Sequence, residues 1–219
     1  MEYLNPIEET EEPIKEAKNQ SSSMKELFDW LDIIVASIVS VVIIFTFLFR
    51  VVTIVGGSMQ NTFYNGEKII ISNLFYTPEF GDVVVISRNA NNTTDELSAV
   101  NEPLIKRVIA TGEQYVDIDF EKGKVYVGYS SNRADMIELD EPYTKTPTNL
   151  ESDVQFPLYV PEGYVFVLGD NRNDSKDSRF SEIGENGLVN EKYILGKAVF
   201  RIFPLNRAGK IEDIDGGLE

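Results

Sequence analysis

One stretch of the chain is almost wholly apolar. Residues 33–49 include only three polar side chains, two serines and a threonine, and no charged one. As a helix rising 1.5 Å per residue, this stretch would span roughly 26 Å, close to the roughly 30 Å of a bilayer core. A soluble helix of this length would carry a polar stripe, and a cleaved signal peptide would have a basic start and a small-residue cleavage site. The pattern predicts a retained transmembrane helix over residues 30–52.

The residues before this stretch have the opposite character. They are polar and rich in glutamate, so they cannot bury enough surface to fold alone, and we expect residues 1–29 to form a mobile acidic tail. Three lysines precede the apolar stretch, while Arg50 and Lys68 follow it. The positive-inside bias is therefore slight, and charge counting alone leaves the orientation of the helix open.

Short β-type runs follow the apolar stretch. Val, Ile, Tyr and Phe dominate these runs, and Gly, Asn, Asp and Pro separate them. The predicted strands are 51–55, 68–71, 83–86, 104–109, 115–118, 124–127, 164–168 and 194–203. The fold class is therefore mainly β. We expect a β core from residues 53–112 and 161–207, a smaller inserted region at 113–160, and a C-terminal tail at 208–219.

Composition excludes several classes of function. The formal charge of −16 argues against a nucleic-acid partner, because phosphates demand basic surfaces. The chain has no cysteine and no histidine, which removes disulfides, cysteine-based metal sites and most zinc sites. We therefore expect no metal and no cofactor. The same absence excludes Ser-His-Asp and Cys-His catalysis.

Ser58 is the first candidate for chemistry. It follows two glycines, which allow a tight turn and close approach of another chain, as a nucleophile facing an extended peptide requires. A serine nucleophile needs a base, and without histidine a lysine or a carboxylate must accept its proton. The alternative is an ordinary Gly-Gly-Ser turn.

Lys106 is a candidate for that base. It lies in an apolar predicted strand and shares a face with Leu104 and Val108. Apolar surroundings disfavour the ammonium and lower the pKa. A base working near neutrality needs a pKa about 2–3 units below the ordinary value of about 10.4, which corresponds to about 3–4 kcal/mol. The alternative is an exposed strand lysine.

A dense polar segment, residues 169–179, follows the apolar strand predicted at 164–168. It is not a calcium loop, because the glycine at the sixth position and the glutamate at the twelfth are missing. Asp177 and Arg179 can pair to brace the segment, and its short Ser and Asn side chains suit local bonding to the backbone.

The order of these segments resembles that of the type I signal peptidases, and the resemblance covers residues from about 30 to 205. The corresponding segments are Gly-Gly-Ser-Met (56–59) after an anchor, Gly-Asp-Val-Val-Val-Ile (81–86), Lys-Arg-Val-Ile (106–109) and Gly-Asp-Asn-Arg-Asn-Asp-Ser-Lys-Asp-Ser-Arg (169–179). The last segment is the most specific, because it matches at every required position.

The resemblance implies a role for each matching residue. Ser58 would be the nucleophile and Lys106 the general base, while Ser175 would hydrogen-bond the lysine and orient it. Asp177 and Arg179 would form a supporting ion pair. The family fold is a membrane-tethered, mostly β catalytic core with a second region inserted between the lysine segment and the last one.

Two further positions next to Ser58 are implied as supporting residues. Met59 would help shape the substrate cleft. Gly56 stands where some members have a serine whose hydroxyl helps the oxyanion hole, and glycine there is similar to Gram-positive members; the second oxyanion donor stays open. The family's usual Ser-Met-x-Pro-Thr-Leu is Ser-Met-Gln-Asn-Thr-Phe here (58–63), and its Gly-Leu-Pro-Gly is Ala-Thr-Gly-Glu (110–113).

The expected function is that of a membrane-bound serine endopeptidase that cleaves signal peptides from exported preproteins. Its partners would be those signal peptides and the lipid bilayer, with the catalytic domain outside the cytoplasm; the sequence predicts no oligomeric state. One alternative is a catalytically silent, membrane-tethered assembly factor, which would be expected to lack the serine or the lysine. The other is a self-cleaving Ser/Lys repressor, but residues 1–50 contain no basic helix-turn-helix.

Overall fold

The computed structural model describes residues 12–87, 103–151, 153–212 and 214. The side chains of residues 12–23 and 44–48 also lie outside the description. The chain divides into two compact units, Met1–Phe47 and Leu48–Glu219, which are described separately.

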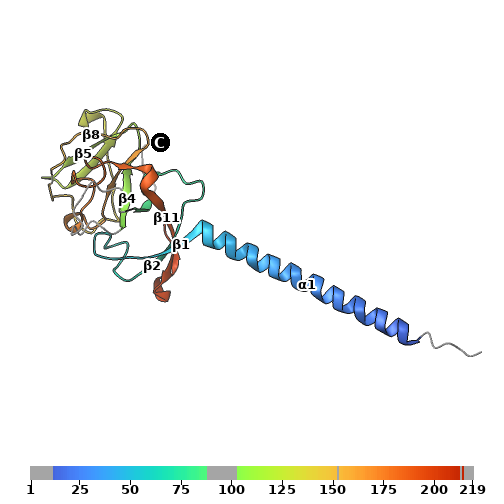
Figure 1. Ribbon diagram of the computed structural model, residues 1–219. Coiled ribbons are helices and arrows are strands. Elements are labelled where there is room, and N and C mark those ends of the chain that lie inside the picture. The colour runs from blue at the N-terminus through green and yellow to red at the C-terminus, as the bar shows by residue number, and fades with distance from the viewer. Residues whose placement is uncertain (1–11, 88–102, 152, 213, 215–219) are drawn as a thin grey trace, which may run out of the picture. The chain divides into compact units, whose positions relative to one another are not determined.

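The first unit contains helix α1 (Glu12–Leu48) (Figure 1). The helix begins inside the segment that we expected to be a mobile tail, and it ends four residues before the predicted boundary at residue 52. Residues 49–52 are strand instead of helix, because Phe49–Thr53 pairs with a strand further along the chain. Among the residues that the structure describes, no helix has both the length and the apolar character needed to cross a membrane.

The larger sheet of the second unit is antiparallel throughout the described residues. Its strands follow the order β1-β2-β11-β3-β4-β9-β10, with β12 paired to β11. They are β1 (Phe49–Thr53), β2 (Lys68–Ser72), β3 (Val83–Ile86), β4 (Leu104–Ala110), β9 (Tyr164–Leu168), β10 (Val189–Asn190), β11 (Ile194–Phe203) and β12 (Gly209–Lys210).

The smaller sheet falls within the region predicted as an insertion. Its order is β7-β6-β5-β8, again antiparallel. The strands are β5 (Tyr115–Asp119), β6 (Lys124–Gly128), β7 (Ile137–Glu138) and β8 (Leu158–Tyr159). Short 3-10 helices complete the described elements: η2 (Arg133–Asp135), η3 (Arg172–Asp174), η4 (Glu191–Tyr193) and η5 (Leu205–Arg207). The prediction of a mainly β fold is confirmed.

Strand β4 positions the candidate site, because it lies between β3 and β9 in the larger sheet. Apolar clusters cover it on both faces: Ile105 packs in one cluster and Val108 in another. Successive strand residues point to opposite faces, so neighbouring side chains of β4 enter different clusters. Lys106 and Arg107 are consequently both buried, with 2% and 1% of their surface exposed.

Candidate active site

Ser58 and Lys106 meet in the folded chain. Ser58 lies in the turn between β1 and β2, and Lys106 lies 48 positions away on β4. The Lys106 Nζ donates a hydrogen bond to the Ser58 Oγ at 2.9 Å and another to the Ile105 carbonyl at 3.1 Å. When the amine is neutral, the same contact places a proton acceptor within hydrogen-bond reach of the serine hydroxyl.

Burial lowers the pKa of Lys106. Desolvation lowers the pKa of Lys106 to about 8, outweighing the carboxylates of Asp177 and Asp170, which raise it. The Arg179 guanidinium acts in the same direction as burial. A lysine with this pKa is neutral in an appreciable fraction of molecules near pH 7–8, as a general base requires.

The backbone at Ser58 is held by the polar segment 169–179. The Asn171 backbone N–H donates to the Ser58 carbonyl at 2.9 Å, and its side-chain amide donates to the Gly57 carbonyl at 3.1 Å. Behind the turn, Met59 is buried in the cluster that contains Ile105. Met59 therefore supports the turn from the core, and its expected contribution to the substrate cleft stays a prediction.

Gly169 allows this close approach. A Cβ at Gly169 would lie 2.6 Å from the Ser58 carbonyl oxygen and 2.2 Å from the Ser175 Oγ, so a larger residue would push the two segments apart. Ser175 is buried close to Ser58, but its expected hydrogen bond to Lys106 is not formed. Its Oγ has no partner among the described residues, and the hydrogen bonds of the Lys106 amine there go to Ser58 and Ile105.

The expected pair of Asp177 and Arg179 is present and fully buried. Arg179 donates to Asp177 through Nε at 2.8 Å and Nη2 at 3.0 Å, and the Gly169 backbone N–H donates to the same carboxylate at 3.0 Å. Arg179 Nη1 also reaches the Leu150 carbonyl at 3.0 Å. A bidentate pair with these additional bonds holds the segment rigidly.

A second buried ion pair was missed by the sequence reasoning. Arg107 donates to Asp170 through Nε at 2.9 Å and Nη2 at 2.7 Å, and through Nη1 to the Gly81 carbonyl at 2.6 Å. Its guanidinium also lies 4.1 Å from the centre of the Tyr143 ring. The available signal was the alternation of β4, which directs Arg107 away from Lys106.

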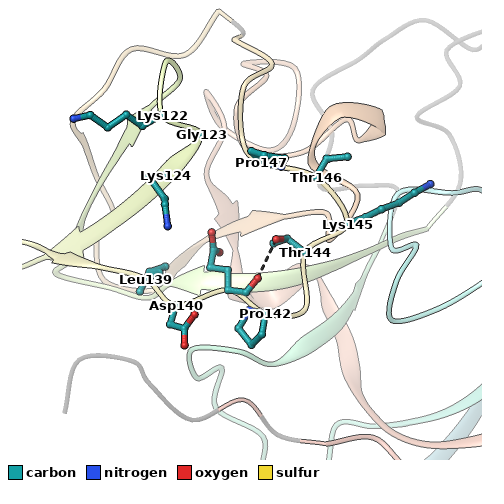
Figure 2. A pocket seen from close by; sticks show the side chains of 11 residues that line it. Lys122, Gly123, Lys124, Leu139, Asp140, Pro142, Thr144, Lys145, Thr146 and Pro147 are labelled. Atoms are coloured by element: carbon teal, nitrogen blue, oxygen red, sulfur yellow. Dashed lines mark hydrogen bonds between the residues drawn. The ribbon is translucent and has the colours of Figure 1, made fainter.

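The inserted region contacts the polar segment 169–179 directly. Glu141 forms an ion pair with buried Arg172 at 2.5 Å, and Arg172 also donates to the Thr148 hydroxyl at 2.7 Å. The Lys145 backbone N–H donates to the Asp170 carbonyl at 2.8 Å. The same loop borders a pocket of about 330 Å³, from which the Lys145 side chain extends outward (Figure 2).

Backbone geometry accounts for two departures from the family pattern. Asn61 has φ +97°, a left-handed conformation that the fixed φ of proline, near −65°, cannot reach, and its amide donates to the Tyr143 carbonyl at 3.0 Å. Gly56 has φ +89°, a left-handed conformation that glycine adopts readily because it has no Cβ. Glycine at position 56 and asparagine at 61 therefore fit the turn that this chain forms.

Comparisons with known proteins identify the family. Residues 27–203 match the family profile described as "Signal peptidase, peptidase S26". A "Probable signal peptidase I-2" of Synechocystis sp. is 32% identical over 93% of this chain and 87% of its own length. A "Signal peptidase I P" of Bacillus subtilis subsp. natto is 30% identical over 88% and 96%. A "Signal peptidase I" of Bacillus licheniformis is 30% identical over 89% and 98%. The resemblance inferred from the sequence is confirmed, and the chain belongs to the signal peptidase family, peptidase S26.

Proposed function

We propose that this chain is a signal peptidase I that removes signal peptides from exported preproteins, with Ser58 as nucleophile and Lys106 as general base. The observation that carries the proposal is the contact between the two side chains. A lysine nitrogen lies 2.9 Å from a serine hydroxyl in surroundings that lower its pKa to about 8. Family membership supplies the reaction class, and this contact supplies the residues.

Acylation begins with attack on the scissile carbonyl. The Ser58 Oγ forms a bond to the carbonyl carbon while its proton passes to neutral Lys106 Nζ, and the carbonyl electron pair moves onto oxygen. The Ser58 backbone N–H stabilises that oxyanion. The carbon–nitrogen bond then breaks, and protonated Lys106 gives its proton to the amine of the mature protein, which leaves.

Deacylation repeats these steps with water. Lys106, neutral again, takes a proton from the water that attacks the ester carbon. The bond between that carbon and Ser58 Oγ breaks, and Lys106 returns the proton to the serine oxygen. The signal peptide leaves with a new carboxyl group, and the enzyme is regenerated.

The remaining candidate residues position this pair. Asp177 and Arg179 hold the segment whose Asn171 N–H bonds to the Ser58 carbonyl. Ser175 presents an unpaired buried hydroxyl beside the nucleophile, which suits reorientation toward the lysine during turnover. Small subsites would select small side chains at the first and third positions before the cut.

The proposal includes a single membrane anchor, with the catalytic domain on the extracytoplasmic side. The almost wholly apolar and uncharged sequence of residues 33–49 supports it. Two of its polar side chains are satisfied within the helix, because Ser37 donates to the Ile33 carbonyl and Ser40 to the Ala36 carbonyl, each at 2.7 Å. An anchor would hold Ser58 close to the bilayer surface, where the substrate's own apolar segment ends.

Ser58→Ala and Lys106→Ala test the proposal on a preprotein with a small-x-small cleavage site. Each substitution removes a participant in proton transfer, so we expect processing to fall at least about 1,000-fold. Lys122→Ala, which removes an exposed lysine of the inserted region, is the matched control and keeps full activity. Unchanged processing by either active-site variant would reject the mechanism and favour a silent assembly factor.

A further inference from the structure

We propose that Gln60 supplies the second hydrogen bond to the oxyanion formed at Ser58, and that Lys145 orients it. This inference rests on the proposed function of Ser58. The tetrahedral intermediate carries a full negative charge on oxygen, and stabilising it in a partly desolvated site requires preorganised donors. The Ser58 N–H is one donor. Gly56 has no side chain to provide another, and its φ of +89° disfavours one.

The turn around the nucleophile brings Gln60 back to it. The Gln60 backbone N–H donates to the Gly57 carbonyl at 3.0 Å, which closes a tight turn with Ser58 inside it. A Cβ on Gly57 would lie 3.3 Å from Gln60 Nε2, so the side-chain amide rests against the Gly57 backbone. Gly57 directly precedes the Ser58 nitrogen, whose N–H is the first oxyanion donor.

Lys145 determines which end of the amide faces the turn. Its Nζ donates to the Gln60 Oε1 at 2.6 Å. An ammonium has hydrogens but no acceptor, so only the amide oxygen can face it, and the amide nitrogen faces Gly57. The Lys145 side chain reaches Gln60 by extending away from the pocket that its own loop borders (Figure 2). Its charge also polarises the amide, which strengthens the N–H groups as donors.

The Gln60 amide nitrogen is available for a ligand. Among the described residues, it donates no hydrogen bond to the protein. Asn171, the other side-chain amide beside the nucleophile, already donates to the Gly57 carbonyl at 3.1 Å and to Asp174 at 3.4 Å. Asn171 is therefore committed to holding the turn.

Ser175 also has an unpaired hydroxyl near Ser58, but it lies on the wrong side for this role. The position 2.2 Å from its Oγ, where a Gly169 Cβ would be, is 2.6 Å from the Ser58 carbonyl oxygen. Ser175 thus faces the carbonyl side of Ser58. An oxyanion bound by the Ser58 N–H would lie on the other side of Ser58, next to Gly57, where the Gln60 amide lies.

Gln60→Glu distinguishes hydrogen-bond donation to the oxyanion from a structural contact with Lys145. The substitution keeps the shape of the side chain and the oxygen that Lys145 binds, but it removes both N–H groups. We expect kcat to fall about 100-fold with KM unchanged, and Gln60→Ala to show a similar loss. Rates are compared on the plateau at high pH, because a new carboxylate raises the pKa of a nearby lysine. Gln155→Glu makes the same charge change at an exposed position of the inserted region and is the control.

A peptide aldehyde, which adds to Ser58 and forms an oxyanion-like hemiacetal, provides the second measurement on the full-length enzyme. Gln60→Glu should weaken aldehyde binding more than tenfold while the affinity for a non-covalent product peptide stays within twofold. Lys145→Met, which frees the amide to rotate, should show a smaller loss of about threefold to tenfold in kcat.

The outcomes distinguish this inference from the proposed function. If Gln60→Glu keeps wild-type kcat and aldehyde affinity while Ser58→Ala is inactive, the oxyanion role of Gln60 is rejected and the Ser58/Lys106 mechanism stands. If Ser58→Ala remains active, both are rejected. A loss in Gln60→Ala alone, with full activity in Gln60→Glu, would reduce Gln60 to a structural link with Lys145.

Discussion

Lys106 and Arg107 are neighbours on β4 and are both almost fully buried, but their charged groups have different hydrogen-bond partners. On one face of the strand, the Arg107 guanidinium donates two hydrogen bonds to the Asp170 carboxylate and one to the Gly81 carbonyl. On the other face, Lys106 has a serine hydroxyl and one carbonyl oxygen as its hydrogen-bond partners. Burial is the same at the two positions, and the difference lies in compensation: within the described part of the chain, Arg107 alone of the two cations has a carboxylate as a hydrogen-bond partner.

The free-energy cost of burying the charge therefore differs between Arg107 and Lys106. Removing a charge from water costs several kcal/mol, and only close, well-oriented opposite charges and hydrogen bonds recover that cost. For Arg107 the Asp170 carboxylate supplies such a partner, and the pair ties β4 to the segment 169–179. For Lys106 the recovery is partial, because the carboxylates of Asp170 and Asp177 raise its pKa less than desolvation lowers it.

The largest change in the free energy of unfolding is expected from removing Arg107, the cation with a carboxylate partner. Arg107→Ala leaves Asp170 buried without its bidentate partner, so we expect the free energy of unfolding to fall by about 3–5 kcal/mol. Denaturant unfolding of the full chain in detergent, followed by circular dichroism, measures it. Arg133→Ala is the control, because this arginine pairs with Asp117 but is 43% exposed, and it should cost less than about 1 kcal/mol. Equal costs for both variants would contradict the comparison.

Replacing Lys106 by an uncharged residue should raise the free energy of unfolding, whereas Arg107→Ala lowers it. Unfolded Lys106 titrates at 10.5 and folded Lys106 at about 8, so the buried ammonium destabilises the fold by about 3 kcal/mol below pH 8. Lys106→Met removes that cost, so we expect an inactive protein that is up to about 3 kcal/mol more stable at pH 7.

The gain should shrink as the pH rises from 8 to 10.5, because the unfolded wild type then binds more protons than the folded one. Unfolding curves of the variant and the wild type at pH 7 and pH 10.5 test this sign. A gain that stays constant with pH would mean that packing of the methionine, and not titration of the lysine, causes it.

The smallest expected effect is the change in the activity of the wild type with pH. If neutral Lys106 is the base, kcat/KM should rise tenfold per pH unit below about 8 and level off above it, so activity at pH 7 is about a tenth of the plateau. Initial rates on a signal-peptide substrate between pH 5 and 10 measure this. A midpoint near pH 5 would instead indicate a carboxylate base.

Much of the fold follows from local pattern. The strand predicted at 83–86 coincides with β3, and the strand predicted at 104–109 ends one residue before β4 does. The agreement is expected because buried apolar runs of β-type residues, bounded by turn residues, form strands. The helix boundary does not follow. Phe49 continues the apolar pattern of the helix, but it pairs with Ser72 in β2, and no local signal reveals such a partner.

By itself, the sequence determined the chemistry that was available: a serine after two glycines, no histidine or cysteine, and therefore a lysine or a carboxylate as base. Only the tertiary structure decided which groups act together. It placed Lys106 against Ser58, paired Asp170 with Arg107, and brought Lys145 of the inserted region to Gln60, while the Ser175 hydroxyl has no partner within the described part of the chain. The reason is physical, since desolvation and hydrogen bonding depend on distances of a few ångströms between segments that the chain keeps far apart.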